Sequence, residues 1–111
     1  MKLKDKTVLV TGGGSGIGKA TSILFAEEGA ILAVSDIDLR SAEQVAGKIR
    51  ATGGKAIALS GDVTSSEDVR SLVDGTVEQL GSLNLLVNSA GITYRQVESG
   101  LSTEEVWAKV I

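Results

Sequence analysis

Residues 7–18 read TVLVTGGGSGIG, a run typical of a β-strand followed by five glycines in seven positions. The apolar residues of 7–11 predict a buried strand, and the spacing of Ala20, Leu24 and Phe25 predicts a helix directly after the glycines. Glycines let a turn approach a ligand closely, and the first turn of a helix offers unpaired amides and a positive dipole end. We therefore expect this turn to bind a phosphate group, the alternative being a flexible turn without a ligand.

The rest of the chain repeats this alternation of strand and helix. Strand patterns lie at 7–11, 30–35, 56–59 and 83–88, and the segments between them place apolar residues on one helical face. Candidate capping residues open the later helices: Asp38, Thr64 with Glu67 or Ser65 with Asp68, and Ser102 with Glu105. The pattern predicts an α/β fold, a Rossmann-like doubly wound parallel sheet with helices on both faces. We expect about four strands in the order 3-2-1-4.

The composition excludes several classes of function. The 111 residues contain no cysteine and no histidine, which excludes disulfide scaffolds and serine–histidine hydrolysis. The net charge of −3, without a basic stripe, gives no sign of nucleic-acid binding. No apolar run is long enough to cross a membrane and the start lacks a secretory signal, so we expect a cytoplasmic protein with small-molecule ligands.

Three phosphate-binding patterns compete for the glycine turn. Residues 13–19 have the spacing of a nucleoside triphosphatase loop, but Ala20 stands where that motif needs a serine or threonine for magnesium. The common dinucleotide pattern G-x-G-x-x-G fails because Ile17 falls on its third glycine. The pattern G-x-x-x-G-x-G fits, at Gly12, Gly16 and Gly18.

Residues 11–18 match T-G-x-x-x-G-I-G, and here the chain resembles the short-chain dehydrogenase/reductase family, an NAD(P)-binding Rossmann fold. The later landmarks follow in order, so the resemblance covers essentially the whole chain. It implies that the turn binds the pyrophosphate of NAD or NADP. The implied contacts are Gly12, Ser15, Gly16, Ile17 and Gly18.

An acid at the end of the second strand favours NAD over NADP. Asp36 lies about 20 residues beyond the glycine turn, where a carboxylate can accept hydrogen bonds from the adenosine ribose. A 2′-phosphate would meet this charge, and neither Ser15 nor Ile37 is basic. Asp36 could instead cap the next helix, but Asp38 already offers that cap.

Two further segments complete the expected cofactor site. Asp62 and Val63 stand where the family uses an Asp-Val pair to hold adenine, although Asp62 could equally form an Asx turn. Residues 88–91 read NSAG, similar to the family's N-N-A-G with serine in place of the second asparagine. By this resemblance Asn88, Ala90 and Gly91 line the ribose pocket, an ordinary turn being the alternative.

The sequence offers no catalytic residue and no metal site. The family uses a tyrosine with a lysine four residues later, but Tyr94 is followed at that distance by Glu98, so we interpret Tyr94 as a loop residue. The helix around Trp107 is cut at Ile111, before the family's active-site asparagine, and Trp107 is expected in a core or subunit interface. Residues 1–111 are thus interpreted as one domain, the N-terminal portion of an NAD-binding domain truncated in its fourth helix.

The main hypothesis is an NAD-dependent oxidoreductase that interconverts an alcohol and a carbonyl, inactive as these 111 residues alone. The alternative is a non-catalytic dinucleotide-binding module or pseudoenzyme, and a phosphotransferase is a third. A Tyr-x-x-x-Lys beyond Ile111 would favour the first. The last strand is expected either to form an open edge or to await another strand, and this and the cut helix are also compatible with a homo-oligomer.

Overall fold

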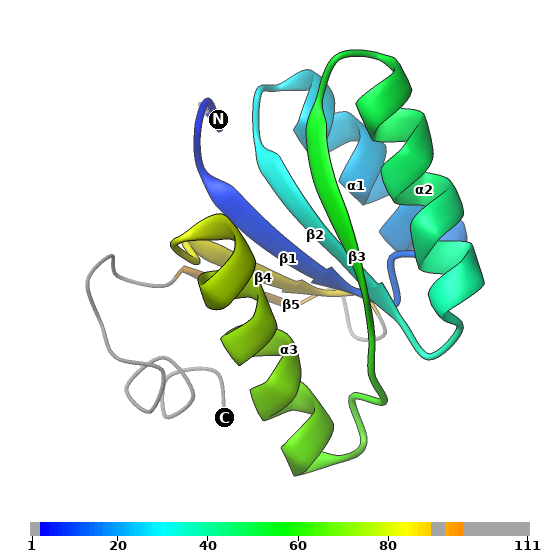
Figure 1. Cartoon of the computed structure of the whole chain (residues 1–111), viewed down its shortest axis with the longest axis vertical. Helices are drawn as coiled ribbons and strands as arrows, with labels where there is room; N and C mark the ends of the chain where they lie inside the picture. Colours follow the sequence, from blue (N-terminus) through cyan, green and yellow to red (C-terminus); the bar gives the residue numbers. More distant parts are fainter. Residues whose placement is uncertain (1–2, 90–92, 97–111) are drawn as a thin grey trace.

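The computed structural model describes residues 3–89 and 93–96. Strands and helices alternate as predicted up to the fourth strand (Figure 1). The elements are β1 (Thr7–Thr11), α1 (Gly16–Glu27), β2 (Ile31–Asp36), α2 (Leu39–Ala51), β3 (Lys55–Ser60), α3 (Ser66–Leu80), β4 (Leu85–Asn88) and β5 (Thr93–Gln96).

The strands form a single sheet in the order β3-β2-β1-β4-β5, in which the first four are parallel. Val8 of β1 lies opposite Leu32 of β2 on one side and Leu85 of β4 on the other. The predicted order 3-2-1-4 is therefore confirmed, and with it the Rossmann-like class. Strands β2 and β3 are added on one side of β1 and β4 on the other, so the strand order reverses between β1 and β4. Open α/β sheets bind ligands at this topological switch point.

The sheet has an apolar core on each face. Side chains alternate across β1, so that Val8 and Val10 join the core under α1 and α2 while Leu9 joins the core under α3. Figure 1 shows α1 and α2 together on one side of the sheet and α3 on the other. A strand buried on both faces explains the continuous apolar run at the start of the sequence.

Two of the predicted helix starts are confirmed. The side chain of Asp38 accepts a hydrogen bond from the amide of Arg40 at the start of α2. The side chain of Ser65 accepts one from the amide of Asp68, which decides between the two capping patterns considered for α3.

β5 was not predicted from the sequence. Its residues pair antiparallel with β4, Asn88 opposite Thr93 and Leu85 opposite Gln96, so the predicted open edge of β4 is covered. The interpretation of Tyr94 as a loop residue is therefore wrong for its backbone. A strand of four residues without an apolar pattern gives little signal, whereas the unpaired amides and carbonyls along β4 strongly favour a partner.

Several sequence predictions lie outside the described residues. These are the helix start at Ser102 with Glu105, the truncated helix with Trp107, and the contacts predicted for Ala90 and Gly91. Within the described part of the chain, no helix has the length and apolar character needed to cross a membrane.

Candidate functional site

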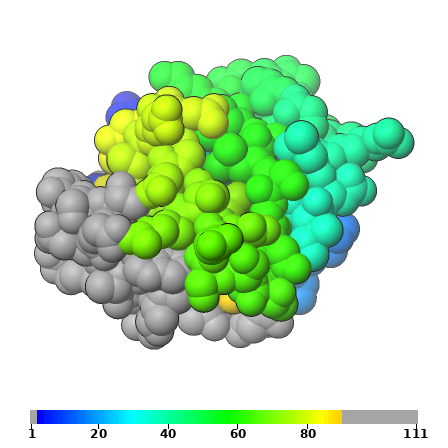
Figure 2. All heavy atoms as spheres, turned by 60° about the horizontal axis from the view of Figure 1, so that its bottom comes forward, coloured from blue at the N-terminus to red at the C-terminus, as the bar shows by residue number. Residues whose placement is uncertain are grey.

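Four loops meet at the carboxyl edge of the parallel strands. Because β1 to β4 run in the same direction, the segments that follow them leave the sheet at one edge. This brings the glycine turn, Asp36, Asp62 and Ser89 to the same end of the molecule. The space-filling view of this end shows the cyan residues after β2 beside the green residues after β3 (Figure 2).

The first half of the glycine turn is tied to β2. The amide of Gly13 donates to the carbonyl oxygen of Ser35 at 2.7 Å, and the amide of Gly14 donates to Oδ2 of Asp36 at 3.0 Å. Both contacts join residues more than 20 positions apart and leave the two amides fully used. This half of the turn is therefore part of the scaffold.

The same half is tied to the end of β4 as well. The hydroxyl of Ser89 lies 2.7 Å from the carbonyl oxygen of Thr11 and 3.2 Å from that of Gly12. The hydroxyl of Thr11 in turn lies 3.4 Å from the carbonyl oxygen of Val87 and 3.3 Å from Oδ1 of Asn88. One hydroxyl from β1 and one from the residue after β4 thus join the ends of these two strands across the switch point.

The second half of the turn is open. Ser15, Gly16 and Ile17 are exposed, and the Ile17 side chain keeps 58% of its surface in solvent. Ser15 is the N-cap of α1, yet its side chain makes no capping hydrogen bond. Gly16 has a φ of 56°, and a side chain built on it would meet no atom within 4 Å. The start of α1 thus lacks a side-chain cap and lies beside open space.

Gly18 brings α1 against the turn. A Cβ atom on this residue would lie 2.1 Å from the carbonyl oxygen of Gly12 and 2.8 Å from its carbonyl carbon, distances that no side chain tolerates. The backbone of α1 can therefore approach the turn only because position 18 is a glycine.

Lys19 is placed differently from the lysine of a triphosphatase loop. It faces Lys48 of α2, whose side-chain hydrogen bond and like charge lower the pKa of the Lys19 ammonium group. In a triphosphatase loop this lysine reaches the phosphates instead. The placement agrees with the missing magnesium ligand at Ala20.

The Asp36 carboxylate is oriented by two backbone amides. Oδ1 accepts from the amide of Asp38 at 3.1 Å, while Oδ2 accepts from Gly14. The helix cap that could have explained Asp36 belongs to Asp38, whose pKa is lowered mainly by the hydrogen bond from Ser41. Each Asp36 oxygen keeps a second lone pair for another donor.

Asp62 forms the Asx turn that the sequence analysis left open as an alternative. Its Oδ1 accepts from both the hydroxyl and the amide of Thr64, at 2.7 and 2.9 Å, and these bonds lower the pKa of the Asp62 carboxyl. The amide of Asp62 donates to Oδ2 of Asp68. Val63 beside it remains 37% exposed. The Asx turn leaves Oδ2 of Asp62 available for a second function.

A groove of about 800 Å³ lies at the opposite edge of the sheet, and none of the predicted site residues lines it. Its walls come from the last turns of α1 and α2 and include Ile23, Ala30 and Ile49. Helices present carbonyls and a negative dipole end at their carboxyl termini. The groove is also lined by two lysines and two acids, so its charged side chains balance: Lys48, Lys55, Asp5 and Glu27.

Sequence reasoning missed two connections in the site. Ser89 stood out only as a departure from a family pattern, and Gly14 was not linked to Asp36. Both contacts depend on how neighbouring strand ends are placed in space, and no local pattern of residues encodes that placement.

The sheet order, the glycine turn at the switch point and the helices on both faces define a Rossmann-like α/β domain. Residues 6–111 match the family model for short chain dehydrogenase. The chain belongs to the short-chain dehydrogenase family, as the glycine pattern indicated.

Similar proteins extend this assignment. The chain is 40% identical over 110 residues to cyclohexanol dehydrogenase of Acinetobacter sp. (strain SE19), an alignment that covers 99% of this chain and 44% of the relative. It also resembles the structure of a 7α-hydroxysteroid dehydrogenase complexed with NADH and 7-oxo glycochenodeoxycholic acid. That comparison has a TM-score of 0.77 and 40% identity, covering 78% of this chain and 34% of the other. The chain thus spans less than half the length of these relatives.

One relative is of similar length. The short-chain dehydrogenase/reductase homolog YusS of Bacillus subtilis (strain 168) is 43% identical over 94 residues, which cover 84% of this chain and 86% of YusS.

Proposed function

We propose that this chain binds NAD(H) and forms the cofactor-binding part of an oxidoreductase that interconverts an alcohol and a carbonyl. The observation that carries the proposal is the contrast within the glycine turn. One half is held by β2 and β4, while the uncapped start of α1 faces open space. A helix start with unpaired amides and positive dipole attracts a diphosphate.

The diphosphate is proposed to lie against the exposed residues Ser15, Gly16 and Ile17. The Ser15 hydroxyl is not engaged in capping, so it can donate to a phosphate oxygen. Gly12 and Gly18 bring the backbone close enough for the ligand to reach the helix start.

Asp36 is proposed to select NAD. Its two oxygens are already oriented by the amides of Gly14 and Asp38, and each can accept one ribose hydroxyl. A 2′-phosphate would repel this carboxylate at contact distance. The adjacent Ile37 is 69% exposed and supplies no positive charge to offset the repulsion.

The adenine and the remaining ribose are assigned by family resemblance. Oδ2 of Asp62 would accept from the exocyclic amine and the backbone of Val63 would contact the ring. Asn88, Ala90 and Gly91 would line the ribose pocket beside the end of β4. The Asx turn supports this placement because it fixes the Asp62 side chain through Oδ1 alone.

Bound nicotinamide would supply the hydride chemistry of the complete enzyme. The 111 residues contain no tyrosine followed four positions later by lysine, so we expect the chain alone to bind NADH without turnover. The named relatives act as dehydrogenases, which supports an alcohol or carbonyl substrate for the complete protein.

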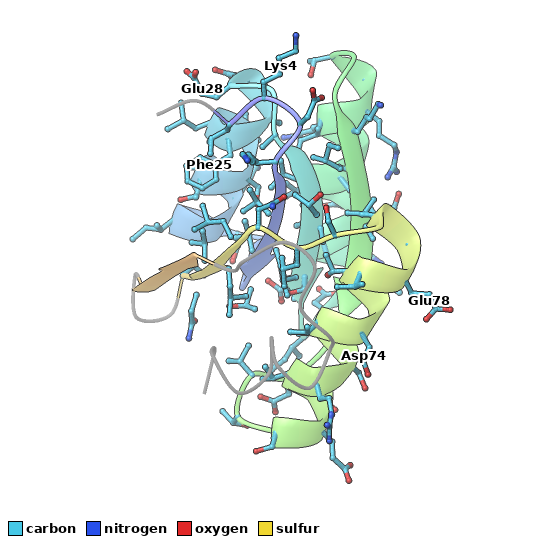
Figure 3. All side chains as sticks on the ribbon, turned by 90° about the vertical axis from the view of Figure 1, so that its left-hand side faces the viewer. Lys4, Phe25, Glu28, Asp74 and Glu78 are labelled. Carbon is cyan, nitrogen blue, oxygen red and sulfur yellow. The ribbon has the colours of Figure 1, made fainter. Side chains whose placement is uncertain are left out.

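Calorimetric titration of the purified chain with NADH, NADPH and Mg-ATP tests the proposal. We expect NADH to bind about tenfold or more tightly than NADPH, the equivalent of roughly 1.4 kcal/mol, and Mg-ATP to bind more weakly than NADH. Asp36→Ala should weaken NADH binding and reduce the ratio of NADH affinity to NADPH affinity. Glu78→Ala removes one exposed charge from α3 and serves as the matched control (Figure 3). An unchanged ratio of NADH to NADPH affinity in Asp36→Ala would contradict the NAD assignment.

A non-catalytic dinucleotide-binding module is the second candidate. It is favoured by the absence, within these 111 residues, of a tyrosine followed four positions later by a lysine. The coding sequence after Ile111 distinguishes the two: a downstream Tyr-x-x-x-Lys supports the enzyme, and a stop codon supports the module.

A further inference from the structure

Ser89 occupies a position between the two strands that flank the switch point. It directly follows β4, and its amide continues the β1–β4 ladder by donating to the carbonyl oxygen of Thr11 at 3.3 Å. Its hydroxyl lies 2.7 Å from the same oxygen and 3.2 Å from the carbonyl oxygen of Gly12. One side chain therefore contacts two successive carbonyls at the point where β1 becomes the glycine turn.

The hydroxyl of Ser89 has one proton, which the carbonyl oxygens of Thr11 and Gly12 share, with the shorter contact to Thr11. The contact with Gly12 restrains the orientation of a whole peptide unit. The carbonyl of Gly12 and the amide of Gly13 belong to one planar trans peptide, so they point in opposite directions. The carbonyl end meets Ser89 after β4, and the amide end donates to the carbonyl oxygen of Ser35 in β2 at 2.7 Å. This peptide thus contacts residues of both neighbouring strands. Its orientation sets the direction in which the following residues of the turn leave the sheet.

Positions 12 and 89 are also matched in size. A Cβ atom on Gly12 would lie only 2.5 Å from the Ser89 hydroxyl oxygen, and Gly12 has a φ of 66°. The small side chain at 89 and the absent one at 12 let the hydroxyl reach the carbonyls directly.

We propose that Ser89 is a positioning residue for the diphosphate site. Its hydroxyl holds the first half of the glycine turn from the β4 side, as Asp36 does from the β2 side, and so directs the start of α1 toward the ligand. The part of this inference that concerns diphosphate binding rests on the proposed function, whereas the part that concerns the conformation of the turn does not. Loss of the hydroxyl should loosen Gly12–Gly14 while leaving the two cores intact.

Residue-resolved amide hydrogen exchange of the ligand-free chain tests the effect on the turn. Ser89→Ala should speed exchange of the Gly13 and Gly14 amides by about fivefold to tenfold, the effect of losing one hydrogen bond. Thr76→Val is the matched control, since Thr76 donates a buried hydroxyl to the Leu72 carbonyl at 2.7 Å within α3. It should leave the turn amides unchanged relative to the rest of the chain. Ser89→Gly, which also lacks the hydroxyl, should repeat the result of Ser89→Ala.

Ligand binding provides the second measurement. Ser89→Ala should weaken NADH binding about fivefold, the effect of one hydrogen bond. Adenosine has no phosphate, so it should bind Ser89→Ala and the unmodified chain with the same affinity. Turn amides that exchange equally in both Ser89 variants and the unmodified chain would overturn the inference. Unmodified chain that fails to bind NADH would overturn the proposed function, while the exchange data would still decide the function of Ser89.

Discussion

The two halves of the glycine turn differ in what surrounds them. Residues Gly12–Gly14 hydrogen-bond to β2 and lie against the end of β4, whereas Ser15–Ile17 face open space and have no side-chain cap. Glycines occur in both halves for different reasons. In the first half and at Gly18 a side chain would collide with backbone or neighbouring side chains, whereas at Gly16 nothing obstructs it and only the positive φ requires glycine. One half is held by packing, and the other is open to solvent and is the half that we propose to bind the ligand.

Gly18→Ala should have the largest effect on this arrangement. The new Cβ would lie 2.1 Å from the Gly12 carbonyl oxygen, and only a shift of backbone could relieve the collision. We expect a loss of about 3 kcal/mol or more in the free energy of unfolding. Urea denaturation followed by circular dichroism measures it. A variant as stable as the unmodified chain would mean that α1 does not pack tightly on the turn.

Gly16→Ala should have a smaller effect with a different cause. No neighbour obstructs a side chain at position 16, so the cost is the left-handed backbone alone, about 1–2 kcal/mol. Gly16→Asn should cost less, because asparagine tolerates this conformation better. The same denaturation experiment compares the two. Equal losses from Gly16→Ala and Gly18→Ala would remove the distinction between a glycine required by close packing and one required only by its backbone conformation.

The sequence predicted the scaffold better than the contacts within the site. The continuous apolar run of β1 and the helical stripes predicted four strands with helices between them, because burial on both faces leaves a local pattern. The strand order was expected from the Rossmann-like fold class and is confirmed. β5 was missed because pairing along an edge is decided by backbone groups. It leaves no apolar periodicity in a segment of four residues.

Within the site, local contacts were accessible and distant ones were not. The capping function of Asp38 and the Asx turn of Asp62 involve residues two or three positions away, so the sequence alone suggested both. The contact between Gly14 and Asp36 joins two strand ends, and that of Ser89 with Thr11 joins residues 78 positions apart. Such contacts follow from the register of the sheet, which short motifs do not contain.

Ser15→Ala should separate stability from binding in the open half of the turn. The Ser15 side chain caps nothing, so the free energy of unfolding should change by less than about 0.5 kcal/mol. Ser65→Ala is the matched N-cap control, since Ser65 accepts from the amide of Asp68, and it should lose about 1 kcal/mol.

For NADH affinity we expect the larger loss in Ser15→Ala and the smaller loss in Ser65→Ala, the reverse of their order in stability. Ser15→Ala should bind NADH about threefold to fivefold more weakly, which calorimetry measures, while Ser65→Ala should bind it normally. If Ser15→Ala destabilises the chain as much as Ser65→Ala does, the start of α1 is capped by Ser15 and the open half has a structural function after all.

The smallest expected effect concerns pH and the Asx turn at the adenosine end of the site. Hydrogen bonds from Thr64 lower the pKa of Asp62 below its ordinary value, so the ionised carboxylate stabilises the folded chain above that ordinary value. This contribution disappears as the pH falls through the lowered pKa of the folded state.

Asp62→Asn keeps an oxygen acceptor for Thr64 but has no charge to lose. The unmodified chain should therefore melt about 2 °C or less above Asp62→Asn at pH 7, and the difference should shrink as the pH falls below the ordinary pKa of 3.8. Both proteins contain the same other acids, so the difference between their melting temperatures at each pH removes the contribution of those acids. A difference that stays constant with pH would show that the charge of Asp62 does not stabilise the turn, and that its geometry alone holds this end of the site.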